Sequence, residues 1–353
     1  MRYVFWGLLI LTVFARYFST RVDCSDGQKL RITGIVRQEP LRYTYSQKIS
    51  LAGLKIYLPK FPEIYYGDKV VVNGVVRQGE LTDAFLVLKE EQQGFLSGFR
   101  KSLVEFYQKT LPEPHAALIA GISLGAKGSL PKDFWESLTK TGTAHVVVAS
   151  GMNVSLVASF LMGVLILLFN RRKALILALT GIWIYTAISG FEAPIIRAAV
   201  MGSIAFTAQR LGRVYSAWRA LVLTGLILLI IVPAWLIDLG FILSFVATAS
   251  ILVFQRRIEK FFSFVPGILK GDFSTTLAAQ VGVTPILFVT FGQFNILSPL
   301  INALVLWTVP LITVLGIVGA LVGLAVPFLG KALLYLAYPL TSWFIAVVSL
   351  FGR

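Results

Sequence analysis

Cysteine, histidine and charged residues are all scarce in this 353-residue sequence. Cys24 is the only cysteine, so no disulfide can form within the chain. The two histidines lack H-x-x-x-H spacing, and without paired cysteines the sequence offers no zinc site. Nucleotide-binding motifs are also missing. Only 14% of the residues are charged and 56% are hydrophobic, which excludes an ordinary soluble protein. We expect most of the chain to lie in lipid.

Despite this scarcity the chain has a net charge of +15, which is typical either of nucleic-acid binding or of membrane topology. Residues 20–92 hold 11 Lys or Arg against 9 Asp or Glu, so this part is nearly balanced. Much of the excess lies between hydrophobic runs, at Arg171, Arg172, Lys173, Arg210, Arg213, Arg219, Arg256, Arg257, Lys260, Lys270 and Lys331. Because the positive-inside rule produces this distribution, the topological interpretation is favoured over a path for a polyanion.

The amino terminus carries an apolar run at Tyr3–Phe18, which suits either a signal-peptide core or a short spanning helix. No small-x-small cleavage site follows the run, and Cys24 lacks the lead-in of a lipoprotein signal. We therefore predict an uncleaved transmembrane anchor at residues 1–20.

Residues 21–92 change to short stretches of alternating polarity, bounded by glycine and proline. The predicted strands are Leu30–Val36, Lys48–Leu51, Leu54–Leu58, Lys69–Val76 and Ala84–Leu88. Gly74 indicates a bend in the fourth of them. Five short strands, one bent, predict a small all-β, OB-like domain.

Such barrels often bind single-stranded nucleic acid through aromatic side chains. Tyr43, Tyr45 and Tyr57 are the candidates for DNA contact in this domain. A structural or docking role is favoured over DNA contact, because tyrosine is a normal strand residue and the domain is nearly neutral.

Residues 93–131 are predicted to form interfacial helices rather than spans. Phe95, Phe99, Leu103 and Phe106 recur at helical spacing among charged residues, which is typical of an amphipathic helix. The apolar stretch Ala116–Leu124 is too short to cross a bilayer alone.

Eight further apolar runs follow in residues 132–353. They are Ala144–Phe169, Ala174–Gly190, Pro194–Gln209, Ala220–Leu236, Leu239–Phe254, Thr275–Phe291, Leu300–Val326 and Ala332–Phe351. With the anchor they predict an all-α polytopic bundle of about nine spans, into which the all-β domain is inserted. A cytoplasmic amino terminus then places the β-domain outside and the basic clusters inside. Several runs correspond to only about 25 Å of helix against a hydrocarbon core of about 30 Å, so we expect some helices to be short or broken.

Polar residues within these runs are costly in lipid and are therefore candidate functional residues. The candidates for the polar core are His145, Ser150, Gly151, Asn153, Glu192, Arg197, Asp238, Ser244, Gln280 and Asn302. A serine hydrolase built on His145 and Ser150 is disfavoured, because residues five apart do not share a helical face. Interhelical hydrogen bonding is the favoured role of His145, Ser150 and Asn153.

Arg197 has two interpretations that the sequence leaves open. It follows Pro194 near a predicted helix end, so its side chain can snorkel to the interface. Alternatively it is buried, and is either held by Glu192 or Asp238 or faces a water-filled path that accepts phosphate.

Four phrases of the sequence, at residues 141–154, 185–201, 238–248 and 280–310, resemble the successive signatures of the membrane-channel domain of the ComEC competence protein family. They read TGTAHVVVASGMNV, YTAISGFEAPIIRAAVM, DLGFILSFVAT and QVGVTPILFVTFGQFNILSPLINALVLWTVP. The similarity extends over roughly His115–Leu350, in order, and an OB-like insert ahead of this region is also found in the family.

The resemblance implies a channel in the bacterial inner membrane through which one DNA strand enters the cytoplasm during natural transformation. The implied partners are single-stranded DNA, membrane lipid, a DNA receptor, a nuclease and a cytoplasmic helicase-like motor, with an oligomer as one arrangement. The family usually has histidine where this chain has Asn153, so an imidazole-dependent role is not expected there.

Many family members continue into a metallo-β-lactamase-like domain, whereas this chain stops at Arg353. We expect no enzymatic activity and no cofactor in this polypeptide. The main alternative function is a secondary transporter of a small anionic solute, built from broken helices around Arg197. A scaffold that only docks other envelope proteins is a third alternative.

Overall fold

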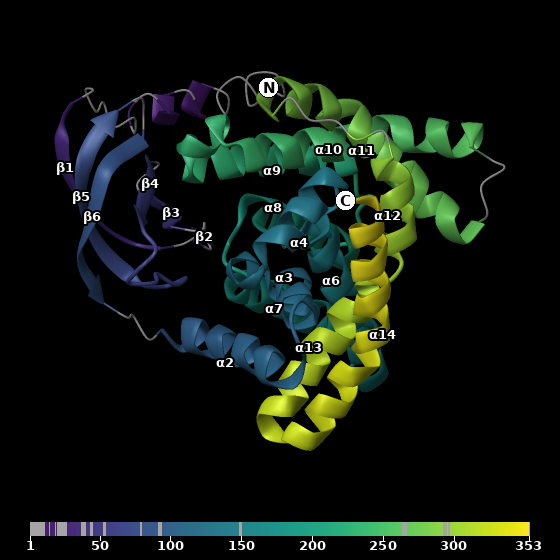
Figure 1. The fold of residues 1–353 in the computed structure, drawn as a ribbon. Helices are drawn as coiled ribbons and strands as arrows, with labels where there is room; N and C mark the ends of the chain where they lie inside the picture. The colour runs from purple at the N-terminus through teal and green to yellow at the C-terminus, as the bar shows by residue number, and fades with distance from the viewer. Residues whose placement is uncertain are drawn as a thin grey trace.

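The computed structural model describes the chain apart from residues 1–10, 14, 18, 20–26, 37–39, 43–44, 52–53, 78–79, 91–93, 148–149, 263–266, 292–294, 296 and 353. Most of the anchor predicted at residues 1–20 therefore lies outside the described residues, and so does Tyr43. The described part is mostly helical and carries one sheet near its amino terminus, on the left in Figure 1.

The sheet has six strands: β1 Lys29–Ile35, β2 Leu41–Arg42, β3 Ser46–Leu51, β4 Leu54–Pro59, β5 Lys69–Arg77 and β6 Glu80–Glu90. Their order across the sheet is β1-β5-β6-β4-β3-β2 (Figure 1). Neighbouring strands are antiparallel except β4 and β6, which run parallel. The five predicted strands are confirmed, and the two-residue β2 is an addition that is too short to show alternation.

The predicted bend in β5 is confirmed by its pairing with β6. The register shifts between Val71 and Val72 and again between Asn73 and Val75, and the second shift includes Gly74. A Cβ atom on Gly74 would lie 2.6 Å from Leu81 Cγ, so only glycine fits against the neighbouring strand. The bulged sheet encloses its own apolar core, to which β5 contributes fully buried valines.

The helices follow the sheet along the chain. They are α2 Phe95–Thr110, α3 His115–Leu124, α4 Lys132–Lys140, α5 Ala144–Val147, α6 Gly151–Leu168, α7 Arg171–Ile188, α8 Ala193–Arg210, α9 Ala217–Ile231, α10 Leu239–Phe261, α11 Gly267–Phe291, α12 Ser298–Leu306, α13 Val309–Ala325 and α14 Pro327–Phe351. Two short 3-10 helices, η1 Lys127–Ser129 and η2 Pro233–Ile237, are also present.

Four described helices are long and apolar enough to cross a membrane, namely α6, α10, α11 and α14. The pair α12 and α13 passes the same test together but is bent by 44° at its break. Of the other predicted spans, α7 and α8 have 18 residues each and include several arginines, and α9 has 15 residues. The described residues thus contain four spans, or five with the bent pair, and nine remains a prediction.

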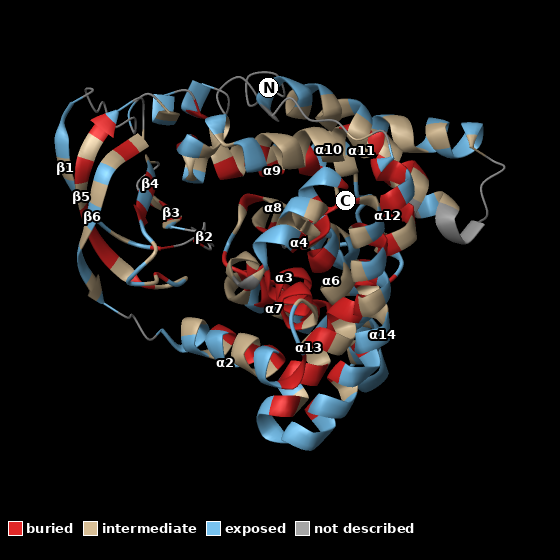
Figure 2. Cartoon of the chain, viewed as in Figure 1, coloured by how far each residue is buried: buried red, intermediate tan, exposed pale blue. Residues whose placement is uncertain are grey.

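Helix α3 forms the centre of the helical part. Every residue from Ala116 to Leu124 is buried, as the red core in Figure 2 shows. Leu103 and Tyr107, on one face of the amphipathic helix α2, pack into the same core, whereas Phe95 at its start is 86% exposed. The prediction that this stretch is too short to cross alone agrees with a ten-residue helix enclosed by protein.

Candidate functional site

Arg197, in the second turn of α8, connects this helix to α10. Its Nε donates to Ser244 Oγ at 2.8 Å, and its Nη1 donates to Thr248 Oγ1. Ser244 and Thr248 are one turn apart on α10, so both hydroxyls face the same guanidinium. The guanidinium also lies 5.9 Å from the ring centre of Phe245 on that helix. Arg197 is therefore directed toward α10, between helices.

The two acidic residues predicted to hold Arg197 have other partners. Glu192 Oε1 accepts a hydrogen bond from Lys127 Nζ at 2.8 Å, and the two side chains are only 13% and 17% exposed. Asp238 Oδ1 accepts from the backbone N–H of Phe241 at 2.8 Å and caps α10. The prediction that either carboxylate holds Arg197 was therefore wrong.

Within the part of the chain that the structure describes, no carboxylate lies within ion-pair distance of Arg197. Hydroxyl oxygens accept hydrogen bonds from two of its nitrogens, Nε and Nη1, but carry no charge that compensates the guanidinium. A charge in this state at membrane depth is costly, and such residues mark sites for ions or charged substrates.

Glycine at position 151 allows α6 to approach this arginine. Gly151 is the first residue of α6, and a Cβ atom there would lie 2.7 Å from Arg197 Nη2 and 3.3 Å from Ala198 Cβ. The preceding Ser150 has a buried Oγ without a hydrogen-bond partner among the described residues. The structure thus brings Ser150, Gly151, Arg197 and Ser244 to one place, although they are far apart in sequence.

A hollow of about 420 Å³ lies along α6 and α8 next to this cluster. Ala198, which follows Arg197, lines it together with Gly202 and Phe206 at helical spacing on α8. Ser155, Ser159 and Gln209 give it polar groups. We call this hollow the α6–α8 groove.

Asn153 lies one turn into α6 but faces α3 instead of the groove. Its Nδ2 donates to the carbonyl of Ile122 at 2.6 Å, and the Tyr185 hydroxyl of α7 donates to the next carbonyl, Ser123 O, at 3.0 Å. These are carbonyls of the last turn of α3, which have no partner within the helix. Asn153 therefore makes an interhelical hydrogen bond, and neutral histidine could supply the same donor.

The remaining candidates lie elsewhere. His145 Nδ1 makes a local hydrogen bond with Gly142 O at 2.9 Å, and Asn302 Nδ2 donates to Ser298 Oγ at 3.2 Å within α12. Gln280 is half-buried on α11. The described contacts join none of these three to Arg197.

On the sheet, two of the three predicted tyrosines are described. Tyr45 is 88% exposed, and the Lys48 ammonium lies 5.6 Å from the ring centre of Tyr57. An exposed ring and a lysine-capped ring are both accessible for stacking.

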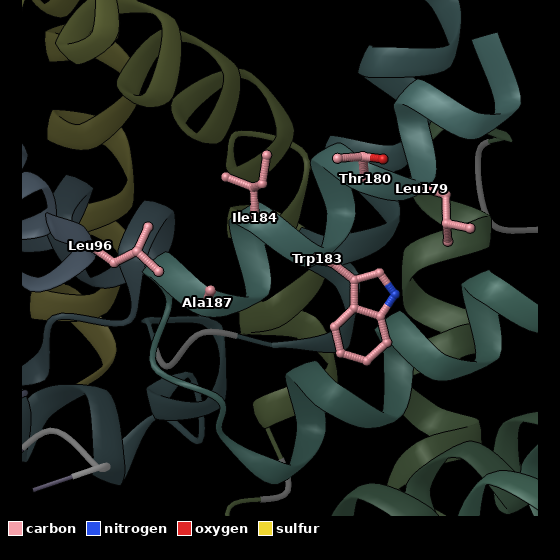
Figure 3. Close-up of a pocket in the computed structure, with 6 residues that line it drawn as sticks. All are labelled: Leu96, Leu179, Thr180, Trp183, Ile184 and Ala187. Carbon is pink, nitrogen blue, oxygen red and sulfur yellow. The ribbon is translucent and has the colours of Figure 1, made fainter. Parts of the chain in front are cut away.

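A second hollow, of about 490 Å³, lies between α2 and α7 (Figure 3). Its lining is almost wholly apolar, and the exceptions are already bonded: Thr180 donates to Ile176 O and Trp183 Nε1 donates to Ser203 Oγ. Such a surface suits lipid chains and not an anion.

The spacing Gly121-x-Ser123-x-Gly125 is a motif that our sequence reasoning overlooked. In hydrolases this spacing places serine on an exposed strand-to-helix turn. Here Ser123 is fully buried in the last turn of α3, and its Oγ has no partner among the described residues. Thr248 was also overlooked, although its position one turn after Ser244 was a usable signal.

Several helices that are long and apolar enough to cross a membrane, together with one bent helix pair, define a multi-pass membrane protein. The family described as "Competence protein" matches residues 122–353, which is more than half of the chain. The chain therefore belongs to the competence protein family.

Three relatives illustrate the similarity. The chain is 28% identical over 256 residues to ComE operon protein 3 of Bacillus subtilis, covering 72% of this chain and 32% of that protein. It is 26% identical over 218 residues to Competence protein ComA of Neisseria gonorrhoeae, covering 59% and 31%. An uncharacterised protein of Aquifex aeolicus is 28% identical over 225 residues, covering 63% and 51%. The chain thus spans about a third to a half of these relatives, and no solved structure matches it.

Proposed function

We propose that this protein acts in DNA uptake for competence, as the inner-membrane conduit through which single-stranded DNA enters the cytoplasm. Membership of the competence family supports the broad role. The observation that supports a conduit is Arg197, which is held between α8 and α10 by neutral hydroxyls and precedes Ala198, a residue that lines the α6–α8 groove. A positive charge without a carboxylate partner can compensate the charge of a phosphodiester.

In this proposal the strand passes along the groove, and the polar side chains of α6 and α8 face it. Ala198 and Gln209, the described ends of the groove on α8, are separated by about 16 Å of helix, roughly half of the bilayer core. No nucleotide-binding motif is present in the sequence, so a cytoplasmic helicase-like motor supplies the work. A DNA receptor and a nuclease complete the proposed machinery.

We further propose that the sheet is an OB-like module that contacts DNA outside the membrane. Support comes from its strand order and from the parallel pairing of β4 with β6, which a five-stranded barrel of this type requires. Tyr45 and the Tyr57–Lys48 pair supply aromatic and positive groups.

The proposed topology has about nine spans and a cytoplasmic amino terminus. The positive-inside distribution of arginine and lysine supports it. In Figure 1 the sheet lies on the left, while the carboxyl end of α10 and the α13–α14 turn, which carry basic residues, lie at the far right and the bottom.

The second candidate function is secondary transport of a small anion. The buried, ten-residue α3 and the 44° break between α12 and α13 favour it, because transporters bind solutes at broken helices.

Uptake of labelled DNA into the cytoplasm separates the two functions. We expect uptake to fail in a deletion strain, to return with the wild-type gene, and to remain defective with Arg197→Leu at normal protein level. Arg197→Lys is the matched control, because it keeps the charge while it loses the planar fork. If the deletion strain imports DNA as well as its parent does, the conduit proposal fails.

A further inference from the structure

The two hydroxyls that hold Arg197 differ from the carboxylates that usually hold a buried arginine. Thr248 Oγ1 donates its own proton to the Ser244 carbonyl at 2.9 Å, so its oxygen accepts from Arg197 with a lone pair. Ser244 Oγ accepts from Arg197 Nε at 2.8 Å. Both partners are neutral, and both leave the arginine free to bind an anion.

A phosphodiester is a better partner for a guanidinium than two hydroxyls. The hydroxyls accept hydrogen bonds from the charged guanidinium but carry no opposite charge, whereas a phosphate is itself ionised and binds a guanidinium through two parallel hydrogen bonds. When Arg197 exchanges the hydroxyls for a phosphate, both hydroxyls remain satisfiable: Thr248 keeps its bond to Ser244 O, and Ser244 can donate to a backbone carbonyl of the preceding turn.

The aromatic ring beneath the guanidinium stays in place during such an exchange. Phe245 packs against Phe241, with 4.4 Å between ring centres, and against Gly225 of α9, where a Cβ atom would lie 3.1 Å from the ring. A fixed ring keeps its attraction for the guanidinium while the N–H groups change partners.

We propose that Ser244 and Thr248 form a releasable hydroxyl latch: they hold Arg197 on α10 in the absence of DNA and yield it to a backbone phosphate of the incoming strand. This inference rests on the proposed function and adds two positioning residues to it. The same exchange breaks the hydrogen bonds between α8, which lines the groove, and α10, while the Phe245 ring stays next to the guanidinium. A carboxylate at either latch position would compete with the phosphate and keep the latch closed.

The test compares Ser244→Asp with Ser244→Asn. The two side chains have nearly the same size, and only aspartate forms a permanent ion pair with Arg197. At equal protein level in the membrane, we expect cytoplasmic uptake of labelled DNA by Ser244→Asp to fall at least about tenfold below uptake by Ser244→Asn, because an ion pair must now be broken. Thr248→Glu against Thr248→Gln repeats the comparison, should an aspartate variant fail to accumulate.

A second measurement uses purified protein and a fluorescent oligothymidylate. The aspartate variant is expected to bind the oligonucleotide at least about tenfold more weakly than the asparagine variant. Equal uptake and equal binding by the acid and amide variants would overturn the latch and leave the conduit standing. A wild-type protein that does not restore DNA uptake to the deletion strain would instead remove the conduit, and the latch with it.

Discussion

The partly buried ion pair between Lys127 and Glu192 offers a quantitative test of how the site is held. Lys127 lies in η1, just after α3, and Glu192 precedes α8, so the pair fixes the start of the helix that carries Arg197. Over the observed 2.8 Å the attraction is about 6 kcal/mol at an effective dielectric constant of about 20. Much of it offsets the cost of removing both charges from water, since the side chains are 17% and 13% exposed.

Breaking the pair from one side leaves a buried charge without compensation. We expect Glu192→Gln to lower the free energy of unfolding of the purified, detergent-solubilised protein by about 3–5 kcal/mol. The double variant Lys127→Met, Glu192→Gln is expected to recover much of this loss, because no charge then remains buried.

A denaturant titration of the four proteins of this double-mutant cycle measures the coupling. The exposed pair of Lys109 and Glu105, also within ion-pair distance, is the matched control, and its neutralisation should cost at most about 1 kcal/mol. If Glu192→Gln costs no more than this control, the pair is screened by solvent and the reasoning from burial is refuted.

Two further predictions follow from single contacts, and a third follows from the topology. Gly74→Ala is expected to destabilise the protein by about 1–3 kcal/mol in the same titration, because the added Cβ would overlap the adjacent strand. An unchanged free energy of unfolding would contradict the close approach of the two strands at this glycine. Asn153→Leu should lower the free energy of unfolding by about 1–3 kcal/mol, because it leaves Ile122 O unpaired. Asn153→His should cost less, since a neutral imidazole can donate a hydrogen bond to the same oxygen. Equal losses for the two variants would contradict the role of Asn153 as a hydrogen-bond donor to α3. Reporters fused after Gly190 and Lys331 should lie on opposite sides of the membrane; finding both on one side would eliminate the proposed crossing scheme.

The site was predictable only in part. The sequence located Arg197, Ser244 and Gly151 within family-like phrases, and the structure brings these three together. The sequence left the surroundings of Arg197 open. The alternative in which Glu192 or Asp238 holds the arginine was wrong, because both carboxylates have other partners. Ser244 and Thr248 are 47 and 51 residues away from Arg197, and Glu192 pairs with a lysine 65 residues earlier.

Local patterns in the sequence by themselves determined the membrane character, five strands, the bend at Gly74 and the family. The membrane character, the strands and the bend depend on composition and on periodicity within a few residues, because both decide which side chains can be buried. The family was indicated by the resemblance of four phrases of the sequence. Only the tertiary structure decided that α3 is enclosed by protein, that the run at 300–326 breaks in two, and that Asn153 binds the end of α3. The physical reason is that a polar group buried away from water must find a partner wherever packing brings one, and packing is set by contacts across the whole chain.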